Sequence, residues 1–322
     1  MAPARPTTPW RTRAALLVAG TVAALLLAEL ALRVAGVPAP SVPTRPDDDR
    51  RREDVRANGI GLREAWQEVP PVLPGQCRVA VLGDSFAYGE SVPLADTLPQ
   101  QLQRRLRAAL PDQPVLVMNL GRPDNDTAQE AARYAALQPT LHANVLLLVA
   151  YINDLDVPNP AYTLADIYGA GGEPGWLAAH SRVAAHLHAR LRLALMQRRT
   201  EAWYRSGIDR STAQSFETMS QHLRALHADT RRDGVAFALT MYPWLYRLDR
   251  YLVPEPHQWL GDFARREHIP WLDLLPVFAG HAHETLRVSP ANEHPNALGH
   301  RLAAEALTPM LVSLCRAVGQ RE

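Results

Sequence analysis

Ser85 could act as a nucleophile, because it follows a short apolar run that ends in a glycine and an aspartate, Val79-Ala80-Val81-Leu82-Gly83-Asp84-Ser85. Such a run predicts a buried β-strand, and Gly83 lets the backbone turn sharply where that strand ends. Ser85 would then lie at the carboxyl edge of a sheet, where open α/β sheets place their chemistry. A serine hydroxyl needs a general base to attack an acyl carbon, so the rest of the chain must supply one.

His294 is the candidate base, and it begins the fourth of four blocks that follow one another along the chain. The second block closes another predicted strand, the third closes the next strand, and the fourth opens the last predicted helix: Asn119-Leu120-Gly121, Tyr151-Ile152-Asn153-Asp154 and His294-Pro295-Asn296-Ala297-Leu298-Gly299-His300. Pro295 restricts the backbone of His294 to extended conformations, which would fix a histidine borne on a loop.

Attack on an ester carbonyl creates an oxyanion, which needs hydrogen-bond donors. We expect three donors: the backbone N–H of Ser85, the backbone N–H of Gly121 and the side-chain amide of Asn153. Gly121 has no Cβ, so its N–H can be approached closely. Asp84 and Asp154 are expected to brace the loops that carry these groups.

In these four blocks, from about Arg78 to Ala317, the chain resembles the SGNH hydrolases, also called GDSL-type esterases. That family is named after a serine, glycine, asparagine and histidine, which occur here in matching order. The resemblance implies a three-layer α/β/α sandwich around a central, mainly parallel five-stranded sheet. It also implies a serine esterase that works through an acyl-Ser85 intermediate, without a cofactor or a metal.

The chain departs from the family pattern just before His294. Family members carry an aspartate two or three residues before the histidine, and this chain has Asn292 and Ala291 there. An asparagine can accept a hydrogen bond from the histidine but brings no charge to stabilise an imidazolium. In a serine protease triad, the change from Asp to Asn costs roughly 10⁴ in rate. Three alternatives stay open: a Ser-His-Asn triad with Asn292, a Ser-His dyad, and a weakened enzyme.

The pattern from Arg78 onward alternates strands with helices, which favours a parallel sheet covered on both faces. The predicted strands are Val79–Leu82, Val115–Leu120, Val145–Ala150, Val235–Met241 and Pro270–Leu274. The predicted helices are Leu94–Leu110, Thr127–Leu137, Arg182–Arg198, Thr212–Asp233, Pro256–His268 and Ala297–Val318. Between them, Tyr162–His180 is rich in glycine and aromatic residues and is expected to be a long loop or cap near the site.

The N-terminus predicts a membrane anchor. Residues 14–28 are apolar except for Thr21, Glu29 follows, and the whole segment 14–36 is close to the ~20 residues that span a bilayer. Arg5, Arg11 and Arg13 precede it, which favours a cytoplasmic N-terminus. The alternative is a cleaved signal peptide, but the nearest small-residue site is surrounded by prolines.

The predicted organisation has four parts. A cytoplasmic N-terminus of residues 1–13 and the transmembrane anchor of residues 14–36 are followed by a Pro-rich, charged linker of residues 37–75 and a hydrolase domain of residues 76–318. Cys77 and Cys315 flank this domain, and they could form a disulfide or remain two unpaired core residues. The formal net charge of +1 offers no electrostatic argument for nucleic-acid binding.

The sequence therefore predicts an esterase that hydrolyses an O-acyl group on a glycan or a small ester. It would be a single-pass protein of the inner membrane with its catalytic domain in the periplasm, and its protein partners are unknown. An O-acyltransferase for envelope polysaccharide would use the same residues. A non-catalytic glycan-binding protein is the other alternative, and the amide at Asn292 motivates it.

Overall fold

The computed structural model describes residues 9–40, 58–155, 172, 174–210, 213–289 and 292–320. The chain divides into two compact units. One combines Met1–Thr44 with Tyr162–Thr200, and the other combines Arg45–Ala161 with Glu201–Glu322. The second unit contains every residue predicted to do chemistry. The segment Tyr162–Thr200 lies within the predicted hydrolase domain in sequence, but it clusters with the N-terminal residues.

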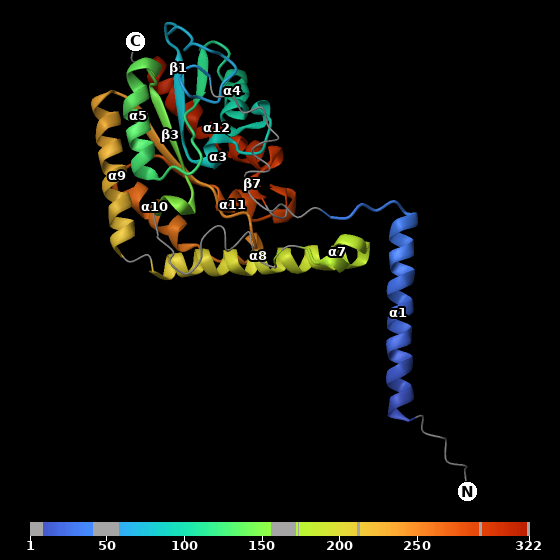
Figure 1. Ribbon diagram of the computed structural model, residues 1–322. Helices are drawn as coiled ribbons and strands as arrows, with labels where there is room; N and C mark the ends of the chain where they lie inside the picture. The colour runs from blue at the N-terminus through green and yellow to red at the C-terminus, as the bar shows by residue number, and fades with distance from the viewer. Residues whose placement is uncertain are drawn as a thin grey trace. The chain divides into compact units, whose positions relative to one another are not determined.

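A five-stranded parallel sheet forms the centre of the second unit (Figure 1). Its strands in spatial order are β2 (Val115–Asn119), β1 (Cys77–Gly83), β3 (Val145–Ala150), β4 (Ala236–Met241) and β5 (Trp271–Asp273). Every neighbouring pair is parallel. The first three strands are buried along their whole length, as expected for apolar runs covered on both faces.

Helices cover both faces of this sheet, which confirms the predicted three-layer fold. Helices α4 (Leu98–Ala109) and α12 (Ala297–Gly319) pack against each other and against β2 and β1. Helices α5 (Thr127–Leu141) and α9 (Ala213–Arg232) pack together, and α9 contacts β4. Figure 1 shows α5 and α9 on the side of the sheet opposite α4 and α12. Helix α10 (Glu255–Arg266) packs against β5.

Further elements complete the described chain. They are η1 (Leu94–Asp96), η2 (Ile152–Leu155), η3 (Leu248–Arg250), η4 (His283–Thr285), α3 (Ser85–Tyr88), α7 (Trp176–His180), α8 (Arg182–Arg210), α11 (Leu275–Phe278), and the antiparallel pair β6 (Arg287–Ser289) and β7 (Asn292–Pro295). Helix α8 is longer than predicted, and α5 continues past Pro139 to Leu141. Most of the predicted loop Tyr162–His180 lies outside the described residues, but its end forms α7.

Two helices of the described chain are long and apolar enough to cross a membrane. Helix α1 (Trp10–Val34) has 25 residues, a mean hydropathy of 2.3 and no buried residue. At 1.5 Å per residue its length is about 37 Å, enough for a hydrocarbon core of roughly 30 Å. The other is α12, which packs against α4 and β1 and is therefore a core helix.

A disulfide joins Cys77 at the start of β1 to Cys315 near the end of α12, with 5.3 Å between the Cα atoms. Of the two alternatives that the sequence left open, the structure has the bridged one. The bond links residues separated by 238 positions, so it closes almost the whole second unit into one loop.

Candidate active site

Ser85 is the first residue of α3, immediately after a sharp turn at the end of β1. Gly83 makes this turn with a φ of +153°, and a Cβ there would lie 2.6 Å from the carbonyl oxygen of Val149 and 2.7 Å from Ala87 Cβ. Asp84 caps the short helix, because its Oδ1 accepts a hydrogen bond of 2.8 Å from the N–H of Phe86. The turn and the cap together fix where the Ser85 hydroxyl lies.

His294 lies on β7, just before α12 begins. The side chain of Asn296 accepts from the N–H groups of Leu298 and Gly299 and so starts that helix two residues after the histidine. The antiparallel partner β6 holds β7 in place. His294 therefore precedes the last helix, on an extended backbone that matches the restriction expected from Pro295.

Ser85, His294 and Asn292 form a continuous chain of hydrogen bonds. His294 Nε2 lies 2.8 Å from Ser85 Oγ, and His294 Nδ1 lies 2.7 Å from Asn292 Oδ1. The same Oδ1 accepts the backbone N–H of His294 at 3.1 Å, and Asn292 Nδ2 donates to Ser91 Oγ at 3.0 Å. The amide oxygen thus faces the ring, so Nδ1 carries the proton and Nε2 can accept the proton of Ser85.

Glu90 belongs to this site, although the sequence reasoning missed it. Its Oε2 lies 3.8 Å from His294 Nε2, its side chain is only 4% exposed, and its N–H donates to the carbonyl oxygen of Ser85. The two side chains therefore lie within ion-pair distance of each other. The sequence offered only one indication, an acidic residue five positions after Ser85. Whether this residue faces the histidine depends on the direction of the chain after α3, which the sequence pattern does not give.

Of the predicted oxyanion donors, Ser85 begins α3 and Gly121 packs against the end of that helix. The N–H of Ser85 belongs to the first turn of a helix, where N–H groups have no intrahelical acceptor. A Cβ at Gly121 would lie 2.2 Å from the backbone nitrogen of Tyr88, so only glycine lets this loop approach α3. The N–H of Gly121 donates to Asn119 Oδ1 at 3.0 Å. The role of the Gly121 N–H as an oxyanion donor stays a prediction. For that role, this N–H must release Asn119 Oδ1 and donate to the substrate instead.

Asn153 lies on η2, directly after β3, and its side chain hydrogen-bonds to Asp84. Burial raises the pKa of Asp84 to about 7, and the hydrogen bonds from Phe86 and Asn153 only partly oppose this. Burial likewise raises the pKa of Asp154 well above its usual value. Asp154 accepts the N–H of Tyr151 at 2.7 Å and so closes the turn that carries Asn153. Both aspartates thus contact the backbone of the loops that they were predicted to brace.

Aromatic rings surround Phe86, the residue after Ser85. The ring of Phe86 stacks on Tyr151 with 3.9 Å between centroids, and it lies 5.1 Å from the ring of His294. Behind it, the hydroxyl of Tyr242 lies 3.2 Å from His300 Nδ1. His300 is fully buried, and burial lowers the pKa of its imidazole to about 3, so this histidine is neutral and part of the core.

A segment that precedes β1 supports the site from outside the matched blocks. The buried guanidinium of Arg63 donates to the carbonyl oxygens of Tyr88, the last residue of α3, and of Gly89 and Val92, which follow it. Its neighbour Glu64 accepts the backbone N–H of Asn119 at 2.8 Å. These residues lie in the part of the chain predicted to be a linker, and their contacts hold two of the four loops at the sheet edge.

Within the described ranges, no group of three or more His, Cys, Asp or Glu side chains is arranged to hold a metal ion. The glutamate next to the candidate base points elsewhere: Glu293 accepts from the indole N–H of Trp244. Burial raises the pKa of Glu293 to about 7.

Comparison with known proteins gives a family match over most of the chain. The model of the GDSL-like Lipase/Acylhydrolase family matches residues 81–302. A search of the curated proteins found no match. Similar solved structures include a lipolytic protein of the G-D-S-L family from Desulfitobacterium hafniense DCB-2, with 15% identity, 72% of this chain and 98% of that chain covered, and a TM-score of 0.46.

Two further structures show the same range of similarity. A two-domain esterase active on acetylated mannans has 14% identity and a TM-score of 0.48, with 74% of this chain and 50% of that chain covered. The lipase/acylhydrolase from Enterococcus faecalis has 12% identity and a TM-score of 0.44, with 74% of this chain and 96% of that chain covered.

Proposed function

The chain belongs to the GDSL-like lipase/acylhydrolase family, and on that premise we propose that it is a serine esterase with Ser85 as nucleophile and His294 as general base. One observation carries the proposal: His294 Nε2 lies 2.8 Å from Ser85 Oγ, while Asn292 fixes the opposite ring nitrogen at 2.7 Å. This is the relation between nucleophile, base and orienting group that covalent catalysis requires.

The proposed reaction has two halves. His294 Nε2 takes the proton of Ser85 as Oγ attacks the ester carbonyl carbon, and the oxyanion of the tetrahedral intermediate is held by the donors at Ser85, Gly121 and Asn153. Collapse breaks the ester bond, and the leaving alcohol takes the proton from His294. Water then attacks acyl-Ser85 after giving a proton to His294, which returns that proton to Ser85 as the carboxylic acid leaves.

In each half of the proposed reaction His294 becomes an imidazolium, and the groups around its ring must stabilise that positive charge. Asn292 supplies orientation without charge, and the Glu90 carboxylate at 3.8 Å from Nε2 supplies a negative charge from the other side of the ring. In our proposal the site is a Ser85-His294-Asn292 triad, with Glu90 as an additional electrostatic support.

We further propose that α1 anchors the protein in the inner membrane with the catalytic unit in the periplasm, so that the substrates are O-acyl groups on glycans or small esters found there. The length and hydropathy of α1 and the arginines before it support this orientation. The disulfide between Cys77 and Cys315 supports an oxidising compartment for the second unit.

A non-catalytic binding protein is the second candidate, because an amide replaces the carboxylate expected behind His294. The two candidates separate in one experiment on the full-length chain in detergent, incubated with p-nitrophenyl acetate and with a fluorophosphonate probe. We expect turnover and a covalent label on Ser85, both lost in S85A and both retained in S313A, which changes an exposed serine on α12.

The outcome that overturns the esterase proposal is a wild-type chain that neither turns over the ester nor takes the label. Adding a sugar acceptor to the same assay divides hydrolysis from transfer. Released acetate indicates an esterase, and acetylated sugar indicates an acyltransferase.

A further inference from the structure

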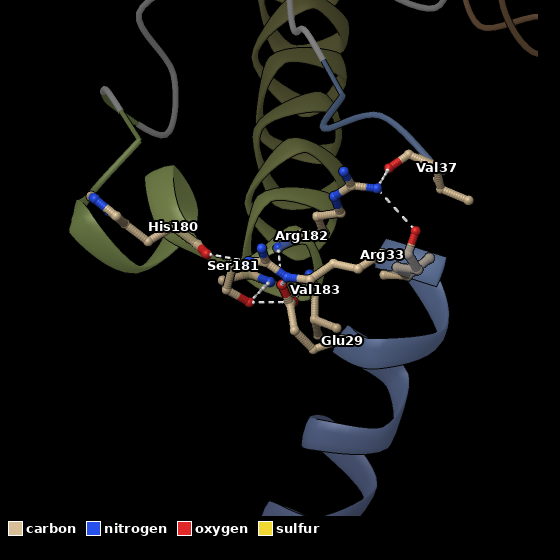
Figure 2. A network of polar contacts seen from close by, with 9 residues as sticks. Glu29, Arg33, Val37, His180, Ser181, Arg182 and Val183 are labelled. Carbon is tan, nitrogen blue, oxygen red and sulfur yellow. Dashed lines mark hydrogen bonds and ion pairs between the residues drawn. The ribbon is translucent and has the colours of Figure 1, made fainter. Parts of the chain in front are cut away.

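The end of α1 and the start of α8 hold each other through reciprocal hydrogen bonds, shown in Figure 2. The carboxylate of Glu29 accepts from the N–H of Arg182 at 3.1 Å, from the N–H of Val183 at 3.0 Å and from the hydroxyl of Ser181 at 2.8 Å. Leading N–H groups of a helix have no intrahelical acceptor, and the positive end of its dipole favours a carboxylate. One side chain of α1 therefore caps the first turn of α8.

The contacts also run in the other direction. The guanidinium of Arg182 donates to the carbonyl oxygens of Leu32 and Val37, at and just beyond the last turn of α1. Arg33 donates to the carbonyl oxygen of His180, the last residue of α7. Each helix end thus satisfies polar groups of the other, and α7 and the start of α8 are held next to the point where α1 ends.

In the proposed anchor, this junction lies at the membrane surface. Glu29 is the first charged residue after the apolar run of residues 14–28, and a charged side chain in the last turns of a span lies at the interface. The following inference rests on that proposed anchor. It concerns only the unit that contains α1, α7 and the first part of α8.

The surface that follows this junction exposes large apolar side chains. Outside α1, six large hydrophobic side chains are exposed in the part of the chain that the structure describes, and four of them are Trp176, Leu177, Leu187 and Leu191. Leu187 and Leu191 are four residues apart, so they lie on the same face of α8. Neighbouring exposed apolar groups of this kind mark a surface for a protein or a membrane.

The charge of the same stretch favours a membrane over a protein as the partner of this surface. Residues 174–200 contain five arginines and no aspartate or glutamate. Arg190 and Arg198 are exposed and, at helical spacing, share the face of Leu187 and Leu191. Apolar and basic side chains next to each other on one exposed helix face are typical of helices that lie in the interface of anionic membranes.

We propose that α7 and the first part of α8, residues 176–198, lie on the anionic headgroups of the leaflet from which α1 emerges. Trp176, Leu187 and Leu191 enter the boundary between headgroups and acyl chains, and Arg190 and Arg198 contact lipid phosphates. The two arginines at about 1 kcal/mol each would together favour the surface-bound state by about 30-fold.

Cysteine labelling of the full-length chain in lipid nanodiscs tests this proposal, because both native cysteines of the described chain are in the disulfide. A polarity-sensitive dye is placed by L187C, by L26C in α1, and by V72C, which marks an exposed apolar residue of the other unit. We expect brominated phospholipids to quench the dye at position 187 and at position 26, but not at position 72. Adding phosphatidylglycerol to a phosphatidylcholine disc should strengthen the quenching at 187.

Charge variants test the arginine contacts. R190Q/R198Q should shift the bound-to-free equilibrium at position 187 by about 30-fold, whereas R231Q/R232Q, which removes the same charge from exposed positions on α9, should leave it unchanged. Quenching at 26 without quenching at 187 would overturn the proposal while leaving the anchor intact. No quenching at 26 would remove the anchor itself. Shielding of 187 by dimerisation, without lipid quenching, would identify a second copy as the occupant and also overturn it.

Discussion

In the proposed triad, Asn292 decides how strongly Ser85 is activated, because its amide oxygen accepts a hydrogen bond from the proposed base His294. Its amide is held from two sides, by the backbone N–H of His294 and by Ser91 Oγ, so its oxygen has a fixed direction toward the ring. An amide held in this way gives the histidine the correct tautomer, which removes one of the two costs of losing the aspartate. The missing charge is the cost that remains.

Replacing Asn292 separates these two contributions. We expect N292A to lower kcat by roughly 10²-fold with little change in KM, because the ring loses its orientation. N292D should raise kcat by about tenfold or more, since a carboxylate within 3 Å of the ring stabilises the imidazolium by a few kcal/mol at most. S91A, which frees one side of the amide, should lose less than N292A. Steady-state kinetics on p-nitrophenyl acetate measures all three, and an unchanged kcat in N292A would indicate a Ser-His dyad instead.

Asp84 makes the stability of the second unit depend on pH. Burial raises its pKa to about 7, far above that of an unfolded aspartate, and the pKa of buried Glu64 and Glu293 is also raised to about 7. Between about pH 4 and pH 7 the folded state therefore binds protons that the unfolded state has released. The stabilisation is complete below the unfolded pKa values and is lost as the pH rises through 7.

We accordingly expect the free energy of unfolding to be lower at pH 8 than at pH 5, by at least the roughly 1.4 kcal/mol of one pKa unit. D84N should reduce this difference, because asparagine resembles the neutral acid and can still accept the N–H of Phe86. D112N, at an exposed aspartate, should not. Urea unfolding at the two pH values provides the measurement, and an equal pH difference in D84N and wild type would contradict the assignment.

At the scale of elements, the segment that carries Arg63 and Glu64 belongs to the catalytic unit. Leu62 is fully buried, and Arg63 donates to three backbone carbonyl oxygens at the end of α3 and just after it. The match to the family begins only at residue 81. A truncation placed at the family boundary would therefore remove the support of α3 and of the loop after β2.

We expect R63L to lower the free energy of unfolding by about 2–4 kcal/mol, because it leaves buried carbonyl groups without donors. It should also lower kcat at temperatures where the variant is folded, since α3 carries Ser85. R104A removes an exposed arginine with a single backbone contact and is the matched control, with less than about 0.5 kcal/mol expected. Thermal unfolding and kinetics test this, and equal stability of the two variants would show that Arg63 does not support the site.

The elements themselves could be predicted well from the sequence. Apolar runs that end in Gly83, Asn119 and Ala150 predicted strands β1, β2 and β3 to within two residues, because burial on both faces leaves few polar interruptions. The pairing of Ser85 with His294 followed from the family pattern. Glu90, Ser91 and Arg63 could not be predicted, since their roles depend on how short loops turn in space rather than on any periodicity.

At the scale of the whole molecule, the disulfide holds the first strand of the catalytic unit to its last helix. Removing it with C77A/C315A should lower the free energy of unfolding by about 2–5 kcal/mol, because the unfolded chain regains the freedom of a very long loop. Differential scanning calorimetry should show a lower Tm for the variant, and reductant should bring wild type to the same Tm. A wild-type Tm that does not respond to reductant would contradict a bridge between these residues.

The division of the chain into these two units could not be anticipated from the sequence pattern. Residues 162–200 stand between β3 and α9 and were expected to form a loop or cap near the site, Tyr162–His180, followed by a helix, Arg182–Arg198, yet they cluster with the N-terminal residues. Glu29 and Arg182 meet across 153 positions of sequence through backbone N–H groups. Such contacts leave no periodic pattern in the sequence, because the carboxylate binds backbone N–H groups at a helix end, and every residue type except proline has such a group.

The separation of Ser85 from His294 by 209 positions has a consequence for biogenesis. The proposed nucleophile is synthesised early and its proposed base near the end of the chain. Strand β1, which leads to Ser85, is covered only once β3 and β2 lie on either side of it. Contacts this distant in sequence form slowly, because the entropy of closing a long loop is lost before the contacts contribute favourable energy. In the proposed mechanism, the growing chain therefore carries an inert serine during its synthesis, and Ser85 becomes reactive only after the segment that carries His294 has folded against it.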